Sequence, residues 1–388
     1  MLPLAYHVRH LLVRRTTTAA TLLGVAAAAL VLASSRMATD GLAAAMGSAG
    51  RDDVAVLLVK GSESELTSQL EAPAAVRAAA LATGAAGVPL ESASHETVVT
   101  VTVARREGGA LSNLVLRGVD ATALSLRPGW RMVAGRAADP GADELMIGRA
   151  VAGRFEGLGV GDRFEIVPGR AATVTGVFAA GGSATESEIW GPRELVAAAT
   201  GRKGITSSVH VLLPAPSRLA AVRAAVAGYR ELDLEATSER ELFERQGLRV
   251  SMLVQGLGGL VGLLLALAAT LGAAVTLHAQ VASRRREIAV LRALGWTRSA
   301  VLLSFLAEGL LLAGAGGALG AAGALLLDGS GTSLVNVASY TEVRVTLLAT
   351  PAALLTALAL AVGVGLAGAL VPAVRAALVK PSSGMRRD

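Results

Sequence analysis

The sequence contains no cysteine, few lysines and few aromatic residues. Without cysteine, the chain forms no disulfide and offers no thiolate for catalysis or metal binding. The lysines are Lys60, Lys203 and Lys380, so nearly all basic side chains are arginine. Phe, Trp and Tyr together make up 3% of the residues, too few for the stacking aromatics of a nucleic-acid-binding surface. We therefore expect no nucleic-acid partner.

Charge is also missing from long stretches of the chain. The runs 16–35, 250–283 and 345–374 contain no charged residue, and 299–327 contains only Glu308. The chain is 53% hydrophobic, with a mean hydropathy of +0.55. About 20 apolar residues cross a bilayer as a helix, and backbone groups in lipid must be hydrogen-bonded internally. The four runs therefore predict four transmembrane α-helices.

The first run has a second interpretation. Its basic start at Arg14–Arg15 and the small residues near Ala33 also resemble a cleaved signal peptide. Signal-peptide apolar regions usually span about 7–15 residues, and this run is longer. We favour a retained helix.

The arginines predict the orientation of the helices. Basic residues gather before residue 16, in 279–299 and after Pro372, whereas the short loop 328–346 contains only Arg344. The positive-inside rule places the basic segments, and hence both termini, in the cytoplasm. We expect a multi-pass protein of the bacterial cytoplasmic (inner) membrane with a large domain outside.

The large segment between the first two runs has mixed composition. Residues 52–61, 96–106, 162–182 and 208–214 are rich in β-branched residues and predict strands, with a turn at Pro168–Gly169. Residues 64–84 and 217–233 have helical composition. Because strands alternate with helices, this segment predicts an α+β or α/β domain.

A helix is expected to lead from this domain into the second run. Ser238 and Glu241 have the spacing of a capping box, and Glu241 and Arg245 form an i,i+4 pair. An ordinary juxtamembrane helix and one that continues into the bilayer both remain open.

These observations predict the following segments: cytoplasmic N-terminus 1–15, transmembrane helix 16–36, extracytoplasmic domain 37–249 with a stalk helix near 238–250, transmembrane helix 250–278, cytoplasmic segment 279–298, transmembrane helix 299–327, outer loop 328–346, transmembrane helix 347–371 and cytoplasmic tail 372–388.

Motifs for catalysis or cofactor binding are not found. A P-loop needs glycine immediately before its lysine, and no lysine here follows glycine. His7 and His10 have i,i+3 spacing but no nearby carboxylate, so an interfacial role is favoured over a metal site. We expect a non-catalytic chain without its own cofactor or metal.

The segment 283–309, "SRRREIAVLRALGWTRSAVLLSFLAEG", is basic and amphipathic. Ile288, Leu291 and Leu294 recur every three residues, Gly295 is a helix stop, and Thr297 can cap the next helix. On composition alone, this helix resembles a passive loop held against lipid headgroups.

This segment closely resembles the signature of FtsX-like ABC transporter permeases, the family of the macrolide-exporter (MacB-like) and lipoprotein-release permeases. The end "VPAVRAALVKP" (371–381) and the stretches 134–136, 158–166 and 174–190 resemble other parts of that family, and Trp296 departs from its usual small residue. The resemblance implies an FtsX-like permease domain over about 255–381 and a MacB-like extracytoplasmic core domain.

The resemblance also implies partners and roles. A dimer of permease subunits, homo- or heteromeric, would work with a separate ABC ATPase that binds ATP and Mg²⁺, and a periplasmic adaptor or effector is a further candidate partner. Membrane lipid surrounds the helices. The ATPase-coupling residues that this family implies are Arg286, Glu287, Ile288, Leu291, Arg292, Leu294 and Gly295.

Two features of the third run predict helix packing. Gly316 and Gly320 have the G-x-x-x-G spacing that lets helices approach closely in lipid, although abundant glycine can also reflect genome composition. Glu308 should be protonated, close to the interface or paired, and we expect a structural partner on another helix.

We therefore expect a permease subunit that converts the motion of an ATPase into movement of the outer domains, for export or for lipoprotein, lipid or peptide extrusion. Two alternatives remain: an FtsX-type mechanotransmitter that regulates a cell-wall hydrolase, and a membrane sensor unrelated to ABC transporters.

Overall fold

A computed structural model of the protein describes residues 15–127, 129–336 and 340–380. The chain divides into two compact units. The helical unit comprises Met1–Asp40, Leu253–Ser330 and Thr346–Asp388, and the sheet unit comprises Gly41–Met252 and Gly331–Val345. The chain therefore passes between the units at four places.

The helices are α2 (Arg15–Ala49), α3 (Ala72–Ala86), α4 (Thr122–Ser125), α5 (Arg193–Ala199), α6 (Leu219–Gly228), α7 (Glu239–Ser283), α8 (Arg285–Ala293), α9 (Arg298–Leu325) and α10 (Pro351–Ala377). The strands are β1 (Val54–Val59), β2 (Leu70–Glu71), β3 (Ala93–Ala104), β4 (Leu111–Val119), β5 (Trp130–Gly135), β6 (Glu144–Gly148), β7 (Arg163–Val167), β8 (Arg170–Ala180), β9 (Glu188–Pro192), β10 (Ile205–Thr206), β11 (Ser208–Leu212), β12 (Leu234–Ser238), β13 (Gly331–Asn336) and β14 (Thr341–Thr346).

The sheet unit is built on one large, mostly antiparallel sheet. Its strand order is β12-β1-β11-β3-β4-β9-β6-β8-β5, and β7 pairs with β8 off this path. The pairs β4–β9 and β6–β8 are parallel. Each stretch predicted to be extended contains a strand of this sheet, and 162–182 forms the β7–β8 hairpin with Gly169 at φ +82°.

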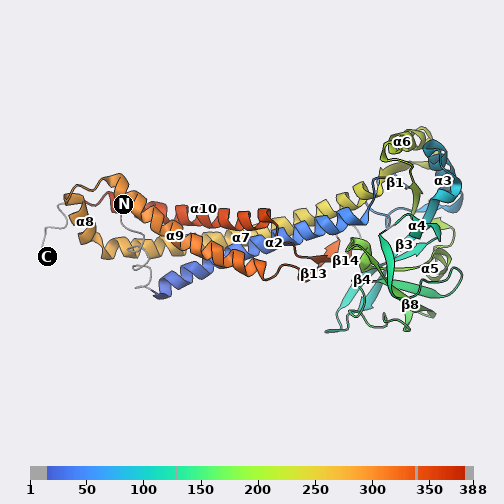
Figure 1. Ribbon diagram of the computed structural model, residues 1–388, viewed down its shortest axis with the longest axis horizontal. Coiled ribbons are helices and arrows are strands. Elements are labelled where there is room, and N and C mark those ends of the chain that lie inside the picture. Colours follow the sequence, from blue (N-terminus) through green and yellow to red (C-terminus); the bar gives the residue numbers. More distant parts are fainter. Residues whose placement is uncertain (1–14, 128, 337–339, 381–388) are drawn as a thin grey trace. The chain divides into compact units, whose positions relative to one another are not determined.

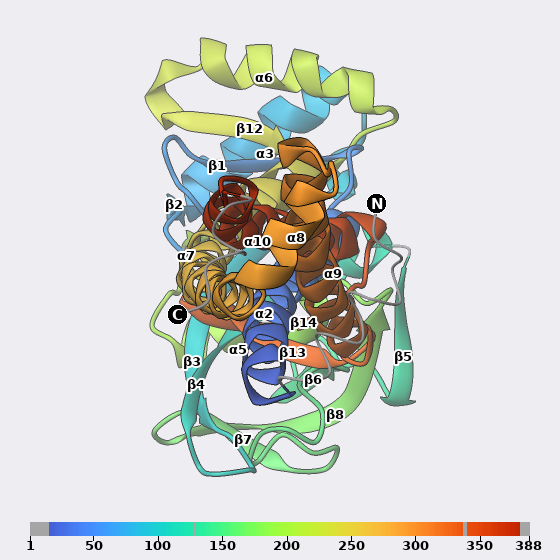
Figure 2. The same ribbon diagram turned by 90° about the vertical axis from the view of Figure 1, so that its left-hand side faces the viewer.

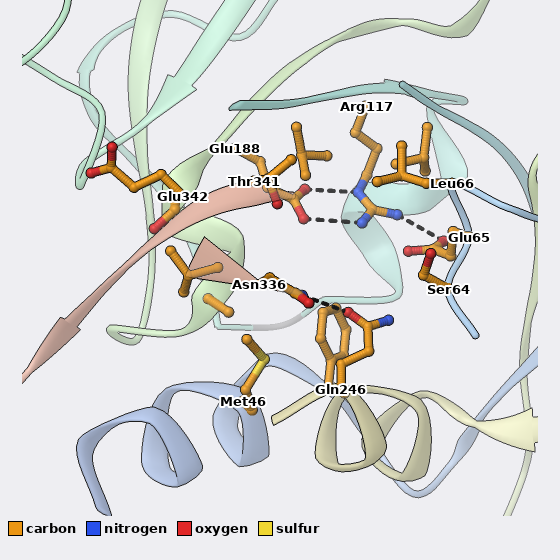
Figure 3. Close-up of a pocket in the computed structure, with 16 residues that line it drawn as sticks. Met46, Ser64, Glu65, Leu66, Arg117, Glu188, Gln246, Asn336, Thr341 and Glu342 are labelled. Atoms are coloured by element: carbon orange, nitrogen blue, oxygen red, sulfur yellow. Dashed lines mark hydrogen bonds and ion pairs between the residues drawn. The ribbon is translucent and has the colours of Figure 1, made fainter. Parts of the chain in front are cut away.

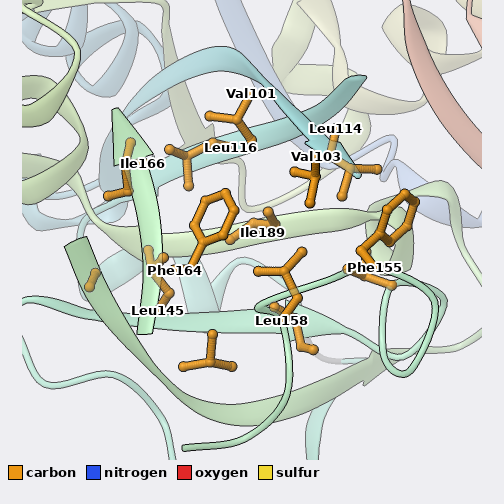
Figure 4. Packing of buried hydrophobic residues seen from close by; sticks show 14 of the residues in the cluster. Val101, Val103, Leu114, Leu116, Leu145, Phe155, Leu158, Phe164, Ile166 and Ile189 are labelled. Carbon is orange, nitrogen blue, oxygen red and sulfur yellow. The ribbon is translucent and has the colours of Figure 1, made fainter. Parts of the chain in front are cut away.

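Two of the hydrophobic clusters in the sheet unit are large. The larger one packs side chains from β3, β4 and β6–β9 around Phe155, Leu158 and Phe164 (Figure 4). The second lies under α3 and α6, where alanines of α3 pack against Leu57 of β1 and Val209 and Val211 of β11. Because alanine side chains are small, α3 can lie close to the sheet and pack its alanine-rich face directly on β1 and β11.

Alternation along β1 divides its side chains between two faces. Ala55 and Leu57 face the α3–α6 cluster, whereas Val56 and Leu58 pack against Leu242 at the start of α7. Successive strand residues point to opposite faces, so a fully apolar strand is buried on both. The start of α7 is therefore part of the sheet unit's core.

The helical unit contains long apolar helices that run side by side (Figure 1, Figure 2). Among the described residues, α2, α7, α9 and α10 are long and apolar enough to cross a membrane. Four such helices with a large α+β domain fit a membrane permease, as predicted from the sequence.

Three of these helices extend beyond the predicted segments. Helix α2 continues past residue 36 to Ala49, with an ion pair between Arg36 and Asp40 one turn apart. Helix α7 is unbroken over 45 residues, and its first turn is capped by Ser238 Oγ, which accepts from the Glu241 backbone N–H. Helix α10 continues through Pro372 to Ala377.

The segment between α9 and α10 contains two strands that were not predicted. It forms the β13–β14 hairpin, which belongs to the sheet unit. The sequence predicts a short outer loop here, and its place outside the membrane stays a prediction. Its two short strands pair with each other, and the contacts that attach them to the rest of the sheet unit, such as those of Glu342 with Arg105 and Arg154, involve residues distant in sequence.

Candidate functional site

Helix α8 closes one end of the helical unit (Figure 2). Arg284 precedes α8 at its N-cap position, Thr297 Oγ1 accepts from the Ala300 N–H at the start of α9, and Gly295 between them has φ +98°. The predicted helix stop and cap are therefore present. They make α8 a short, separately oriented helix between two long ones.

Part of the apolar side of α8 is buried against neighbouring helices. Ile288 and Ala289 are 4% and 1% exposed and pack with Val281, Phe305 and Ala376. We expected Ile288 to share one docking surface with Leu291 and Leu294. In the structure, helices α7, α9 and α10 cover Ile288, and the contact of these three residues with a partner stays a prediction.

The rest of α8 faces outward. Val290 is 53% and Leu294 76% exposed, while Leu291 and Arg292 are half-buried. Arg285, Arg286, Glu287 and Gly295 are exposed. The exposed surface of α8 thus combines two aliphatic side chains with charged ones.

Glu308 lies in the core of the helical unit, 1% exposed. Its carboxylate is 3.6 Å from Nη1 of Arg284, whose guanidinium lies 5.7 Å above the ring of Phe305. Arg284 also contacts Glu287 at 3.4 Å. A buried carboxylate needs such a partner, so this pair connects the start of α8 to α9.

Gly316 and Gly320 of α9 lie against α2. A Cβ added at Gly316 would be 2.8 Å from Cβ of Val25, and one at Gly320 would be 2.5 Å from the carbonyl oxygen of Ala26. Gly309 and Gly317 make similar approaches to α10. Helix α9 is therefore held between α2 and α10 by close glycine contacts.

A group of buried charged residues in the sheet unit was not predicted from the sequence. Its members are Glu65, Glu96, Arg117, Arg127, Glu188, His210 and Glu239, and all are less than 10% exposed. They come from β3, β4, β9, β11, the start of α7 and the loops after β1 and α4. We call this group the ionic cluster.

Arg117 is at the centre of the ionic cluster (Figure 3). Its Nε and Nη2 donate to the two oxygens of Glu188 at 2.8 and 3.0 Å. Its Nη1 donates to Glu65 Oε1 at 2.9 Å and to Glu96 Oε2 at 2.7 Å. Three carboxylates hold this guanidinium, and they raise its pKa well above the usual value despite its burial.

The second half of the cluster connects the sheet to α7. Arg127 donates to Glu96 at 2.8 Å and pairs with Glu239, the first residue of α7, at 3.1 Å. His210 contacts Glu65 at 3.0 Å and Glu239 at 3.6 Å.

Neighbouring charged residues shift the pKa values of Glu96 and His210 in the ionic cluster. Burial alone would raise the pKa of Glu96, but Arg127, His210 and Arg117 lower it to about 2. Burial alone would lower the pKa of His210, but Glu96, Glu239 and Glu65 raise it to about 9. Glu96 and His210 are therefore both ionised at neutral pH.

Glu65, Glu96 and His210 also have the spacing of a metal site, with ligand atoms within 4.8 Å of one another. Nη1 of Arg117 bonds to the same oxygens, Glu65 Oε1 and Glu96 Oε2, that a metal would need. The residues therefore do not fit a metal ion, because a guanidinium already neutralises the carboxylates. The arrangement is a structural ion network.

A polar cavity of about 40 Å³ adjoins the cluster, lined by Arg117 and Glu188 on one side and by Gln246 and Asn336 on another (Figure 3). Asn336 donates to Gln246 at 3.0 Å. A cavity of this size has room for only a few water molecules. It separates the cluster from the β13–β14 hairpin and is too small for a transported substrate.

Comparison with known families agrees with this architecture. The model of the MacB-like periplasmic core domain matches residues 16–229, more than half of the chain. The model of the FtsX-like permease C-terminal domain matches residues 259–381. The apolar helices and the α+β unit define a membrane permease. The chain belongs to the FtsX-like and MacB-like family of ABC transporter permeases.

Solved structures provide more distant similarities. The extracellular domain of the noncanonic ABC-type transporter YknZ from Gram-positive bacteria is 15% identical, with a TM-score of 0.36, over 48% of this chain and 100% of that one. A domain of a proposed permease protein from Porphyromonas gingivalis is 17% identical, with a TM-score of 0.24, over 37% and 69%. A search of curated proteins finds no match.

Proposed function

We propose that this chain is the membrane subunit of an ABC transporter and transmits the motion of a separate ATPase to its sheet unit. The observation that carries this proposal is the continuity of α7, which is a single helix from Glu239, in the ionic cluster, to Ser283, beside α8. At about 1.5 Å per residue, 45 residues extend over about 67 Å. A displacement at one end of such a helix is passed to the other.

Helix α2 stiffens this connection. In the helical unit it packs on α7 at Gly258 against Ser35 and at Gly262 against Leu32. In the sheet unit Met46 packs on Gly247, and Nη1 of Arg240 donates to the Gly47 carbonyl at 2.9 Å. The two helices therefore support one another along both units.

The sheet end of α7 is firmly attached. The Arg51 backbone N–H donates to Glu239 at 3.2 Å, and Arg127 pairs with the same carboxylate. A carboxylate in the first turn is also stabilised by the helix dipole. These contacts favour movement of α7 together with the sheet.

Helix α8 is the proposed contact with the ATPase. Val290 and Leu294 supply exposed apolar area, Leu291 supplies part of its side chain, and Arg285, Arg286, Glu287 and Arg292 supply charge around it. Ile288 and the Arg284–Glu308 pair hold α8 on the bundle, so that a push on α8 reaches α9. Both termini and α8 are cytoplasmic in this proposal, and two permease subunits form the working unit with ATP and Mg²⁺ in the partner ATPase.

Affinity purification of the full chain from its host membranes tests this proposal. We expect a P-loop ATPase to copurify and to be stimulated by the chain. Leu294→Asp should reduce copurification at least tenfold, because burying one such side chain contributes roughly 1.5–3 kcal/mol.

Leu326→Asp is the matched control, since Leu326 is 87% exposed just after the other end of α9. It should leave copurification unchanged. Recovery of a cell-wall hydrolase with the ATPase would favour the regulatory function over export. Failure of any ATPase to copurify with the unaltered chain would refute the proposal and favour a sensor.

A further inference from the structure

A second feature at the α8 end of the helical unit has no role in this function. A cavity of about 510 Å³ lies between the ends of α7 and α10 and the start of α8. His278, Val281 and Ala282 line it from α7, Arg285 from α8, and Arg375 from α10, with Leu378, Val379 and Lys380 following. Its volume is typical of a site for a small organic group.

The rim of this cavity is strongly cationic. Arg285, Arg375 and Lys380 are exposed, and Nη1 of Arg375 lies 3.4 Å from Nε2 of His278. Among residues 15–127, 129–336 and 340–380, no carboxylate lines the cavity. The like charges of Arg285 and Arg375 beside one cavity repel one another, and this arrangement favours an anionic occupant.

The floor of the cavity is apolar and well packed. Val281 and Val379 are 6% and 8% exposed and belong to the same hydrophobic cluster as Ile288. The cationic groups therefore stand above a fixed apolar surface, and the pocket is preformed.

Aliphatic side chains lead away from the cavity along both helices. Leu271 and Val275 of α7 are 69% and 70% exposed, and Val371 and Val374 of α10 are 57% and 40% exposed. The helices meet at Gly368, where a Cβ would lie 2.8 Å from Cβ of Ala273. This exposed apolar surface beside the pocket can contact the acyl chains of a lipid, whereas a free anion would not use it.

We propose that this pocket binds the phosphate-bearing headgroup of an anionic phospholipid from the leaflet at the α8 end of the bundle. The phosphate contacts Arg375, Arg285 and Lys380, and the acyl chains lie along α7 and α10. Arginine suits phosphate because its planar group donates two parallel hydrogen bonds. Basic pockets between membrane helices recognise headgroups in this way. The leaflet is the cytoplasmic one if the topology proposed above holds, but binding itself needs no ATPase.

Native mass spectrometry of the full purified chain, exchanged into nanodiscs of phosphatidylcholine with and without phosphatidylglycerol, tests this proposal. We expect phosphatidylglycerol to be retained in preference to phosphatidylcholine. Arg375→Gln and Lys380→Gln should each lower that preference about fivefold, since one basic residue near an anionic surface contributes about 1 kcal/mol.

Arg298→Gln is the matched control, because Arg298 is exposed at the start of α9 but does not line the cavity. It should leave the preference unchanged. Millimolar inorganic phosphate and glycerophosphoglycerol form a second arm and should not displace the lipid. Equal retention by the three variants, or displacement by phosphate alone, would overturn the proposal. Loss of ATPase copurification in Arg375→Gln with unchanged lipid retention would instead assign the pocket to the protein partner.

Discussion

Glu342 of the β13–β14 hairpin accepts a hydrogen bond of 2.5 Å from Nη2 of Arg105, a residue 237 positions earlier in the chain. The same carboxylate pairs with Arg154 and accepts from Ser112 at 2.6 Å and Ser333 at 2.5 Å. Its side chain is 3% exposed. One carboxylate thus attaches the hairpin between α9 and α10 to the sheet unit.

Glu342→Gln should destabilise the sheet unit by about 1–2 kcal/mol, because two arginines lose a charged acceptor. Thermal unfolding of the full chain in detergent, followed by tryptophan fluorescence, measures this loss. Glu194→Gln is the control, since the Glu194 side chain is 81% exposed and its nearest arginine contact is 3.7 Å. Equal midpoints for the two variants would show that the hairpin is not held by Glu342.

The ionic cluster should make stability depend on pH through His210. Burial lowers the pKa of His210, but the carboxylates raise it from 6.5 to about 9. A group with a higher pKa in the folded state stabilises fully below its unfolded pKa, and this contribution disappears as the pH rises through the folded value. The midpoint temperature of thermal unfolding should therefore decrease as the pH is raised from 6.5 to about 9.

His210→Gln should be less stable at pH 6.5 but should show a flatter profile over this range. His95→Gln is the comparison, because His95 contacts Asp120 outside the cluster at 3.7 Å. It should keep the slope of the unaltered chain. An unchanged slope in His210→Gln would mean that another group titrates.

The contact of α9 with α2 should be sensitive to a single methyl group. Gly320→Ala would place Cβ 2.5 Å from the Ala26 carbonyl oxygen, so a helix must shift, at a cost of about 1–3 kcal/mol. Gly314→Ala on the same helix meets nothing within 4 Å and should be neutral or slightly stabilising. Unfolding of the full chain by SDS titration in mixed micelles compares the two variants. Equal effects would argue against close packing at Gly320.

The absence of cysteine allows a clean test of the proposed orientation. Ser217 and Ser299 are both exposed, one in the sheet unit and the other at the start of α9. In intact spheroplasts, Ser217→Cys should react with a membrane-impermeant maleimide, and Ser299→Cys should react only after lysis. Labelling of Ser299→Cys before lysis would reverse the orientation argued from the arginines.

Local patterns predicted much of this structure. Charge-free runs located the four long helices, β-branched stretches located strands such as β1 and β11, and Ser238 and Thr297 cap the helices for which they were expected. Each of these features depends on residues that are close together in the chain, so it can be recognised from local composition and spacing.

The ionic cluster could not be predicted in the same way. Arg117 and His210 each interrupt an apolar strand, and Glu96 lies in the polar first part of β3, so the local signal is weak. Which of them pair depends on the alignment of strands distant in sequence. The burial of Ile288 also depends on residues distant in sequence, because side chains of α9 and α10 cover it.

The sheet unit is not one continuous stretch of chain. Its two parts, Gly41–Met252 and Gly331–Val345, are joined to the helices at four peptide crossings, two of them inside α2 and α7. A soluble fragment cut as 37–249 therefore loses Glu342 and leaves Arg105 and Arg154 without their shared carboxylate. A fragment that keeps these contacts must also include the β13–β14 hairpin, joined to residue 249 by a linker.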